Sequence, residues 1–249
     1  MTQLEISKKL DISRIKVIRY INYAKENGLI EIKLNIPLRD SFDLESKIET
    51  LYSIKECRVV PTFTDFNDIY KYAGEELSDL LMRLLRKGMY VGVSWSNAFR
   101  NVIEHTNISK KIQINVAPII GGLEISDGST TNSNIIAHIF AKKIGGVNYT
   151  INIPAVFDSK EAKEIMENER QIKSLKELVE KVELVIIGVG SMDIKGTAFK
   201  SGYFNLEERQ YLNSLGISAI INLNFLDENG NEVKTKIDDR IIKIFTLEK

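Results

Sequence analysis

The residues best suited to bind a ligand stand where an apolar run ends. The run Tyr90–Val93 is followed by the small polar residues Ser94, Ser96 and Asn97, and an amphipathic stretch begins at Phe99. This order predicts a strand, a short turn and a helix. Backbone N–H groups at a helix N-terminus stabilise an anion such as phosphate. Many parallel α/β domains have such a turn only to connect elements, so the pattern alone leaves a purely structural role open.

Glycines occupy related positions in this run and after two further apolar runs. Gly92 interrupts the first run, where the missing Cβ lets another group approach the backbone closely. Gly121 and Gly122 follow the run 112–120, and Gly190 follows the run 184–189. Ligands of parallel α/β sheets bind outside the carboxyl ends of the strands. The predicted ligand-binding residues are therefore Gly92, Ser94, Ser96, Asn97, Gly121, Gly122 and Gly190.

The sequence offers little for catalysis. An enzyme built on this type of sheet would need an acid–base pair near the strand ends. His105 and His138 fall on or beside predicted helices without the spacing of a triad or a ligand pair, and Asp193 and Glu207 cannot be told from solvated acids. No metal-ligand cluster or glycine–lysine phosphate turn is present in the sequence. We therefore predict a protein that is not an enzyme and that uses no metal and no cofactor.

Composition indicates an ordinary soluble protein. The formal net charge is zero, with 34 basic and 34 acidic residues, and Cys57 is the single cysteine, which fits a reducing cytoplasm. No apolar stretch reaches transmembrane length, so no contact with a membrane is predicted. Basic residues outnumber acidic ones within 1–33, which marks the end of the chain where a nucleic acid would bind.

The basic N-terminal stretch has the pattern of two short helices. Thr2 and Glu5 form a capping box, and Ser13 caps a second helix that ends before Gly28. In the helix-turn-helix plan the second helix enters the major groove of DNA. An αα-hairpin with a solvated basic face is the alternative. The candidate DNA-contacting residues are Ser13, Arg14, Lys16, Arg19 and Tyr20.

A polar stretch at 37–43 indicates the boundary between a DNA-binding region, 1–38, and a ligand-binding domain, 39–249. Beyond it, predicted strands alternate with predicted helices, which indicates an α/β fold with a mostly parallel sheet covered on both faces. The strands are predicted at 57–61, 90–93, 112–120, 149–154, 184–189, 217–225, 233–237 and 241–245, and the helices at 44–52, 68–87, 99–104, 134–144, 160–182 and 206–215. A further short strand is predicted at 29–33.

Several stretches together resemble one family. The N-terminal TQLEISKKLDISRIKVIRYINYAKENGLIEI resembles the helix-turn-helix of bacterial SorC-type transcriptional regulators, which respond to sugars. The resemblance continues through GVSWSNA, PIIGG, NIIAHIFA, INIPA, LVIIGVGS, GYFNLEERQYLNSLG, NFLDENG and RIIKI. It implies a Rossmann-like sheet akin to that of sugar-phosphate isomerases, a phosphorylated sugar as effector, operator DNA as partner, and assembly into dimers or tetramers.

The sequence also departs from the pattern of that family. Members begin with a helix before the capping threonine and continue, after the RIIKI strand, into a turn with a phosphate-binding lysine, so we expect a chain that lacks both ends. Ile15 and Ile18 replace a proline and a serine, Ser96 and Ala98 replace a glycine and a threonine, and Ile220 replaces an acid. We predict a DNA-binding regulator of sugar metabolism. The alternatives are a carbohydrate-binding module without DNA binding and a decayed or fragmentary family member.

Overall fold

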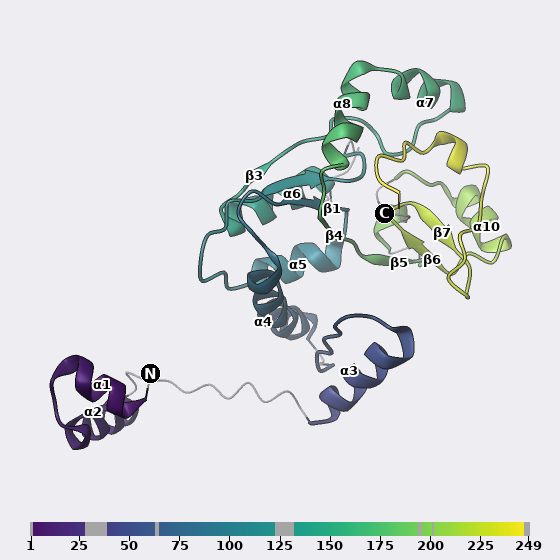
Figure 1. Cartoon of the computed structure of the whole chain (residues 1–249). Coiled ribbons are helices and arrows are strands. Elements are labelled where there is room, and N and C mark those ends of the chain that lie inside the picture. The colour runs from purple at the N-terminus through teal and green to yellow at the C-terminus, as the bar shows by residue number, and fades with distance from the viewer. Residues whose placement is uncertain are drawn as a thin grey trace. The chain divides into compact units, whose positions relative to one another are not determined.

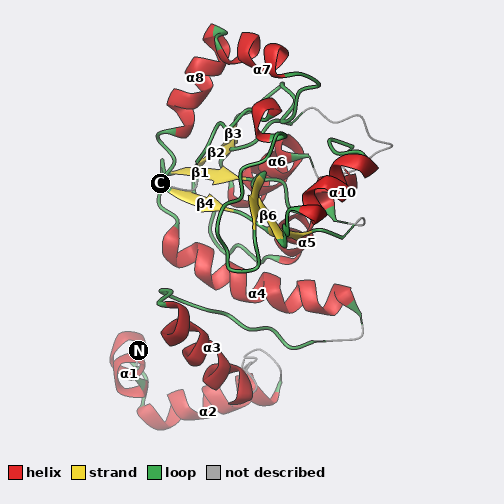
Figure 2. Cartoon of the chain, turned by 90° about the vertical axis from the view of Figure 1, so that its right-hand side faces the viewer, coloured by secondary structure: helices red, strands yellow, loops and turns green. Residues whose placement is uncertain are grey.

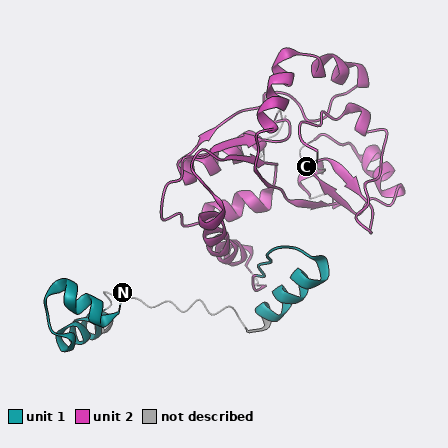
Figure 3. Cartoon of the chain, viewed as in Figure 1, with its two compact units in different colours: residues 1–59 teal, residues 60–249 magenta. Residues whose placement is uncertain are grey.

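The computed structural model describes residues 2–27, 39–62, 65–122, 132–193, 196–200 and 202–246. The chain forms two compact units, residues 1–59 and 60–249 (Figure 3). The predicted strand at 29–33 and the predicted helix end at Gly28 lie outside the described residues.

The first unit begins with the two predicted helices, α1 (Gln3–Leu10) and α2 (Arg14–Glu26), which pack against each other (Figure 1). The capping box is confirmed, because Glu5 N–H donates to Thr2 Oγ1 at 3.3 Å and Thr2 N–H donates to the Glu5 carboxylate at 2.7 Å. Ser13 Oγ accepts from Lys16 N–H at 3.2 Å, as a cap of α2 should. Val17 is buried, with 2% of its surface exposed.

The predicted strand at 57–61 is wrong, because carboxylates of α3 (Arg39–Tyr52) take the place of a strand partner. Glu49 accepts the N–H of Cys57 at 2.7 Å, and the buried Glu45 accepts the N–H of Val59 at 2.8 Å. These carboxylates supply hydrogen-bond partners for backbone donors that a ladder would otherwise have satisfied.

The second unit contains a four-stranded parallel sheet in the order β3-β2-β1-β4 (Figure 2). In this register Val93 lies opposite both Pro118 and Ile186, so that the strands β1, β2 and β4 end at the same edge. The fold class is therefore as predicted, α/β with a mostly parallel central sheet. The strands are β1 (Tyr90–Val93), β2 (Asn115–Pro118), β3 (Val147–Asn148) and β4 (Leu184–Ile186).

Two apolar clusters cover the parallel sheet, as the alternation along β1 requires. Val91 and Val93 belong to a cluster with α4 (Phe66–Leu84), α5 (Asn97–His105) and α6 (Ser133–Ile144). The other cluster joins Val185 to buried side chains of α8 (Arg170–Val179) and to Ile242 and Ile244. A short helix, α7 (Lys160–Glu167), precedes α8.

A second, three-stranded sheet is antiparallel, in the order β5-β6-β7. It packs through Phe225 against Phe204 and Leu212, in a third buried cluster. Its elements are β5 (Val189–Ser191), β6 (Ala219–Ile221) and β7 (Asn224–Leu226), with α9 (Thr197–Lys200), α10 (Leu206–Ser214) and the 3₁₀ helix η1 (Asp238–Arg240) around them.

This sheet overturns several predictions. The single strand predicted at 217–225 is the β6–β7 hairpin, and the run 184–189 is divided between β4 and the start of β5. The runs 233–237 and 241–245 form no strand: the second contributes only the single bridge Val156–Ile241, and the bridge Leu226–Glu232 ends one residue before the first run. Residues 241–245 are apolar because Ile241, Ile242 and Ile244 fill buried clusters.

Two further boundaries differ from the prediction. No strand forms at 149–154, because β3 ends at Asn148. The helix predicted at 160–182 divides into α7 and α8 at Asn168, whose side-chain amide donates to Glu164 O at 2.9 Å and closes the end of α7.

Candidate functional site at the carboxyl edge of the parallel sheet

The loops that follow β1, β2 and β4 start at one edge of the parallel sheet. Ser94 N–H donates to Ile186 O at 3.1 Å, and Ile119 N–H donates to Val93 O at 3.0 Å, so the ladder extends one residue past β1 and β2. The loop after β1 leads directly into α5, and the loop after β2 contains Gly121 and Gly122. The fold thus brings together most of the predicted ligand-binding stretches.

The start of α5 presents backbone donors at this edge. Ser96 is its N-cap, and its hydroxyl accepts from Phe99 N–H at 3.1 Å. This cap leaves the N–H groups of Asn97 and Ala98 without a hydrogen-bond partner within the described residues, and both residues are exposed. An anionic group is stabilised at such a helix end. Ser96 therefore serves the site by shaping the helix start, with its own hydroxyl engaged.

Ser94 was predicted to bind the ligand, but its hydroxyl is engaged within the protein. Its side chain is buried, with 2% of the residue exposed, and its hydroxyl donates to Asn222 Oδ1 at 2.8 Å. Asn222 is itself 8% exposed and belongs to the β6–β7 turn, 128 residues further along the chain. This contact joins the end of β1 to the antiparallel sheet.

Packing accounts for the glycines of the region. A Cβ at Gly92 would lie 2.6 Å from Ile119 Cγ2 and 3.1 Å from Val182 Cγ1, so the close approach there is made by side chains of the core. A Cβ at Gly121 would lie 2.5 Å from the Ala155 backbone nitrogen. Gly122 is in similarly close contact with Asn134.

Two glycines follow the end of β4. Gly190 lies within β5 and pairs with Ile220, so it belongs to the antiparallel sheet and not to the parallel one. Gly188, which begins the stretch 188–191 that the sequence interpretation placed at the same sheet edge, lies against Ser96, and a Cβ there would be 2.6 Å from Ser96 Oγ.

The candidate DNA-contacting residues lie on the first unit. Ser13, Arg14, Lys16, Arg19 and Tyr20 are all exposed. Lys16 Nζ lies 5.9 Å from the centre of the Tyr20 ring, one helical turn away. Ile15 and Tyr23 are also exposed on α2, by 78% and 59%. The start of α2 thus presents basic and aromatic side chains to solvent.

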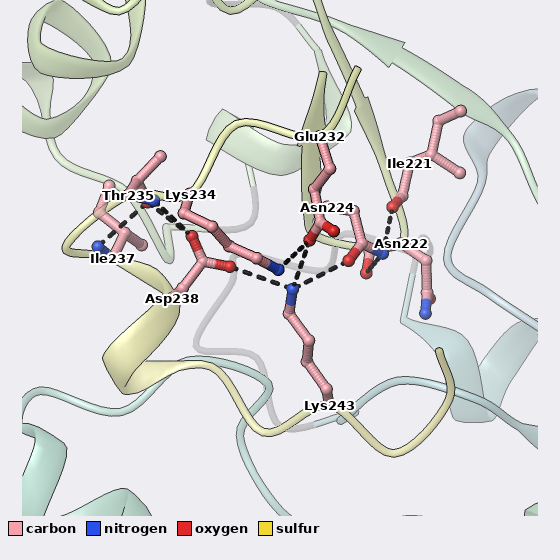
Figure 4. Close-up of polar contacts among 9 residues, drawn as sticks. All are labelled: Ile221, Asn222, Asn224, Glu232, Lys234, Thr235, Ile237, Asp238 and Lys243. Carbon is pink, nitrogen blue, oxygen red and sulfur yellow. Dashed lines mark hydrogen bonds and ion pairs between the residues drawn. The ribbon is translucent and has the colours of Figure 1, made fainter. Parts of the chain in front are cut away.

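A polar network in the C-terminal part was not found from the sequence (Figure 4). Lys243 Nζ lies 2.9 Å from Asn224 Oδ1, 3.1 Å from the Glu232 carboxylate and 3.0 Å from the Asp238 carboxylate. A hydrogen bond from Lys234, at 2.6 Å, lowers the pKa of the Glu232 carboxyl, and Lys243 lowers it further against the opposing effect of burial. A lysine inside the apolar run 241–245 was the available signal.

Four residues of this network line a cavity of about 330 Å³: Asn224, Glu232, Lys234 and Lys243. Gly230, Leu226 and Thr246 complete the lining, and none of the predicted ligand-binding residues takes part in it. Within the described residues no group of histidines, cysteines or carboxylates could hold a metal ion. No helix among the residues that the structure describes is long and apolar enough to cross a membrane.

Residues 37–247 match the model of a protein family described as "Putative sugar-binding domain". The chain belongs to this sugar-binding domain family. The match covers the described parts of α3 and of the whole second unit, including the edge of the parallel sheet.

Relatives of this family member are transcriptional regulators. It is 28% identical to the deoxyribonucleoside regulator of Bacillus subtilis over 248 residues, which cover 98% of this chain and 77% of that protein. It is 25% identical to the sorbitol operon regulator of Klebsiella pneumoniae, over 98% of this chain and 78% of that protein.

Solved structures agree with these relatives. The crystal structure of the full-length sorbitol operon regulator SorC from Klebsiella pneumoniae superposes with a TM-score of 0.76 at 25% identity, over 98% of this chain and 79% of that one. A DeoR family transcriptional regulator from Listeria monocytogenes superposes with a TM-score of 0.71 at 25% identity, over 82% of this chain and 81% of that one. The resemblance to SorC-type regulators is confirmed, and the family member is a sugar-responsive transcriptional regulator.

Proposed function

We propose that the chain binds operator DNA through the exposed start of α2, and that a phosphorylated sugar bound at the carboxyl edge of the parallel sheet changes its affinity for that DNA. The observation that carries the effector site is the pair of N–H groups of Asn97 and Ala98, which have no partner within the described residues and belong to exposed residues at the sheet edge where α/β proteins bind ligands. The phosphate group of the sugar accepts hydrogen bonds from these two N–H groups.

The relatives support a sugar as the effector. Their names refer to a deoxyribonucleoside, sorbitol and erythritol, all small polyhydroxylated compounds or derivatives of one. Asn97 is exposed at this edge, and its side-chain amide can exchange hydrogen bonds with the hydroxyl groups of such a molecule. The sugar acts as a signal. Because the relatives are regulators, we do not expect the chain to convert the sugar chemically.

DNA binding rests on the composition of α2. Arg14, Lys16 and Arg19 are exposed and can neutralise phosphates, and Tyr20 adds a polar contact. We further propose that the chain acts in the cytoplasm as a dimer or tetramer, because two-fold symmetric regulators read two half-sites. Size-exclusion chromatography with light scattering measures that assembly directly.

Fluorescence anisotropy tests both parts of the proposal. The probe is labelled DNA from the region upstream of the gene, titrated at several salt concentrations with and without a panel of sugar phosphates and the matching free sugars. Substituting Lys16→Ala or Arg19→Ala should weaken binding and lower the slope of log affinity against log salt by about one each. Lys173→Ala, an exposed lysine of α8, is the matched control and should change neither.

Two results would contradict the proposal. Equal slopes for the wild type and the α2 variants would remove α2 from the DNA interface. DNA affinity that no sugar phosphate changes, together with no heat of binding in calorimetry, would remove the phosphorylated sugar as effector.

A further inference from the structure

The β6–β7 hairpin turns through two residues that are not glycine. Asn222 and Leu223 have φ angles of 48° and 61°, in the left-handed region that ordinary side chains disfavour. Leu223 is 1% exposed and packs into the third buried cluster, so burial of its side chain holds one half of the turn. The other half is Asn222, a residue type that enters this region more readily, and its backbone carbonyl still needs a hydrogen-bond partner.

Asn224 supplies that partner. Its side-chain nitrogen donates to Ile221 O at 3.0 Å and lies 3.4 Å from Asn222 O, the two carbonyls on either side of the start of the turn. Asn224 is 6% exposed, so its amide has little access to water. Its orientation therefore decides whether the turn carbonyls are satisfied.

Lys243 fixes the orientation of this amide (Figure 4). Its ammonium donates to Asn224 Oδ1 at 2.9 Å and directs its remaining protons to Glu232 and Asp238. With the oxygen of Asn224 facing the ammonium, the nitrogen of the same amide must face the turn. The two carboxylates hold the lysine in place, and only 23% of its side chain is exposed.

The β6–β7 turn places the side chain of Asn222 against the end of β1. Asn222 Oδ1 accepts the hydroxyl proton of Ser94 at 2.8 Å, and both side chains are buried. Ser94 directly precedes Trp95 and Ser96, the cap of α5, whose first N–H groups form the candidate effector site. Three hydrogen bonds thus link Lys243 to Ser94: Lys243 to the Asn224 amide, that amide to the backbone carbonyl of Asn222, and the Asn222 side chain to Ser94.

We propose that Lys243 is a positioning residue for the carboxyl edge of the parallel sheet, acting through the polar relay Lys243–Asn224–Asn222–Ser94. Removing its ammonium frees the Asn224 amide to rotate, which releases the left-handed turn and the acceptor of Ser94. The consequence for effector binding rests on the proposed function. The energetic coupling between Lys243 and Ser94 does not.

A double-mutant cycle measured by thermal unfolding separates the relay from a local role of Lys243. The variants are Lys243→Met, which keeps the aliphatic chain, Ser94→Ala, and the two combined. If the relay operates, the drop in Tm that Lys243→Met causes is smaller in the Ser94→Ala background than in the wild type, by at least about 2 °C. The reason is that substitutions of coupled residues are not additive. Lys176→Met, which breaks the ion pair between Lys176 of α8 and Glu167 of α7, should lower Tm equally in both backgrounds.

An equal drop for Lys243→Met in both backgrounds overturns the relay and leaves Lys243 as a local cross-link. If Lys243→Met does not fold, the same cycle is measured with Lys243→Gln, whose shorter, uncharged side chain lacks the ammonium that orients Asn224.

Calorimetric titration with the sugar phosphate that binds the wild type gives the functional readout. Lys243→Met should weaken that binding three- to tenfold in the wild-type background and leave the affinity of Ser94→Ala unchanged. Equal weakening in both backgrounds also overturns the relay. If the wild type binds no sugar phosphate, the proposed function has failed, while the thermal cycle still decides whether Lys243 and Ser94 are coupled.

Discussion

The two sheets of the second unit are stabilised in different ways. The parallel sheet lies between apolar clusters, and its central strand alternates valines with one glycine that makes room for Ile119. The antiparallel sheet has an apolar side at Phe225, but its turn depends on hydrogen bonds among Asn224, Asn222 and Lys243. Apolar packing therefore sets where the strands lie, and polar contacts set the conformation where the two sheets meet.

The candidate effector site stands at that meeting point. The start of α5 follows directly from the end of β1 in the parallel sheet. The neighbouring Ser94 takes its hydrogen-bond partner, Asn222, from the turn of the antiparallel sheet. Substitutions in the two regions should accordingly differ in size and in kind.

The largest effect is expected for Phe140→Ala in the cluster over the parallel sheet. Phe140 has no exposed surface and meets Phe99 edge-on, with ring centres 5.5 Å apart. Loss of the ring should reduce the free energy of unfolding by about 3–5 kcal/mol. Urea unfolding followed by fluorescence of Trp95, the single tryptophan, measures it. Phe66→Ala, at a side chain that is 71% exposed, is the control, and similar losses for both would contradict the assigned core.

Gly92→Ala should be the next most damaging change. The new methyl group would lie 2.6 Å from Ile119 Cγ2, and overpacking of this kind costs about 1–3 kcal/mol. Gly190→Ala in β5 meets its nearest atom at 3.3 Å and should cost less. A Gly92→Ala variant as stable as the wild type would show that the contact between β1 and Ile119 is looser than described.

Ser94→Ala tests the contact between the sheets. It leaves Asn222 Oδ1 buried without its donor, which should cost about 1–3 kcal/mol of unfolding free energy. Ser214→Ala removes a hydroxyl at the exposed end of α10 and should cost close to nothing. If urea midpoints of the two variants coincide, the Ser94–Asn222 hydrogen bond does not stabilise the fold.

The smallest effect concerns acid sensitivity of the C-terminal network. Lys234 and Lys243 lower the pKa of Glu232 in the folded state, so its stabilising contribution is present above the ordinary glutamate pKa of about 4.3 and is lost as pH falls through the lowered value. Glu232→Gln should therefore lower Tm most near neutral pH. The difference from the wild type should shrink below about pH 4. A difference that stays constant from pH 7 to pH 3 would contradict an ionised, paired Glu232.

Sequence periodicity and capping signals predicted the structural features that depend only on residues close together in the chain. The capping box at Thr2, the cap at Ser13 and the strand Tyr90–Val93 are local features and are confirmed. The β6–β7 turn was missed because Asn222 and Leu223 carry no glycine signal, and the leucine is held there by burial in a distant cluster. The strand predicted at 57–61 failed because two carboxylates of α3 supply its partners.

The same distinction applies to the candidate site. The edge of the sheet could be predicted, because strand ends followed by small polar residues and glycines are visible in the sequence. The partner of Ser94 could not, because Asn222 lies 128 residues away and no pattern connects the two. Gly92 was visible as a close approach, but only the fold shows that the approaching group is a side chain of the core.

Backbone amide shifts of the ¹⁵N-labelled protein, titrated with a panel of sugar phosphates, test the location of the effector site most directly. The proposed function predicts the largest shifts at Asn97, Ala98, Gly121 and Gly122, at the edge of the parallel sheet. Shifts confined to Gly230, Glu232 and Lys243, around the cavity of about 330 Å³, would place the ligand elsewhere and contradict it.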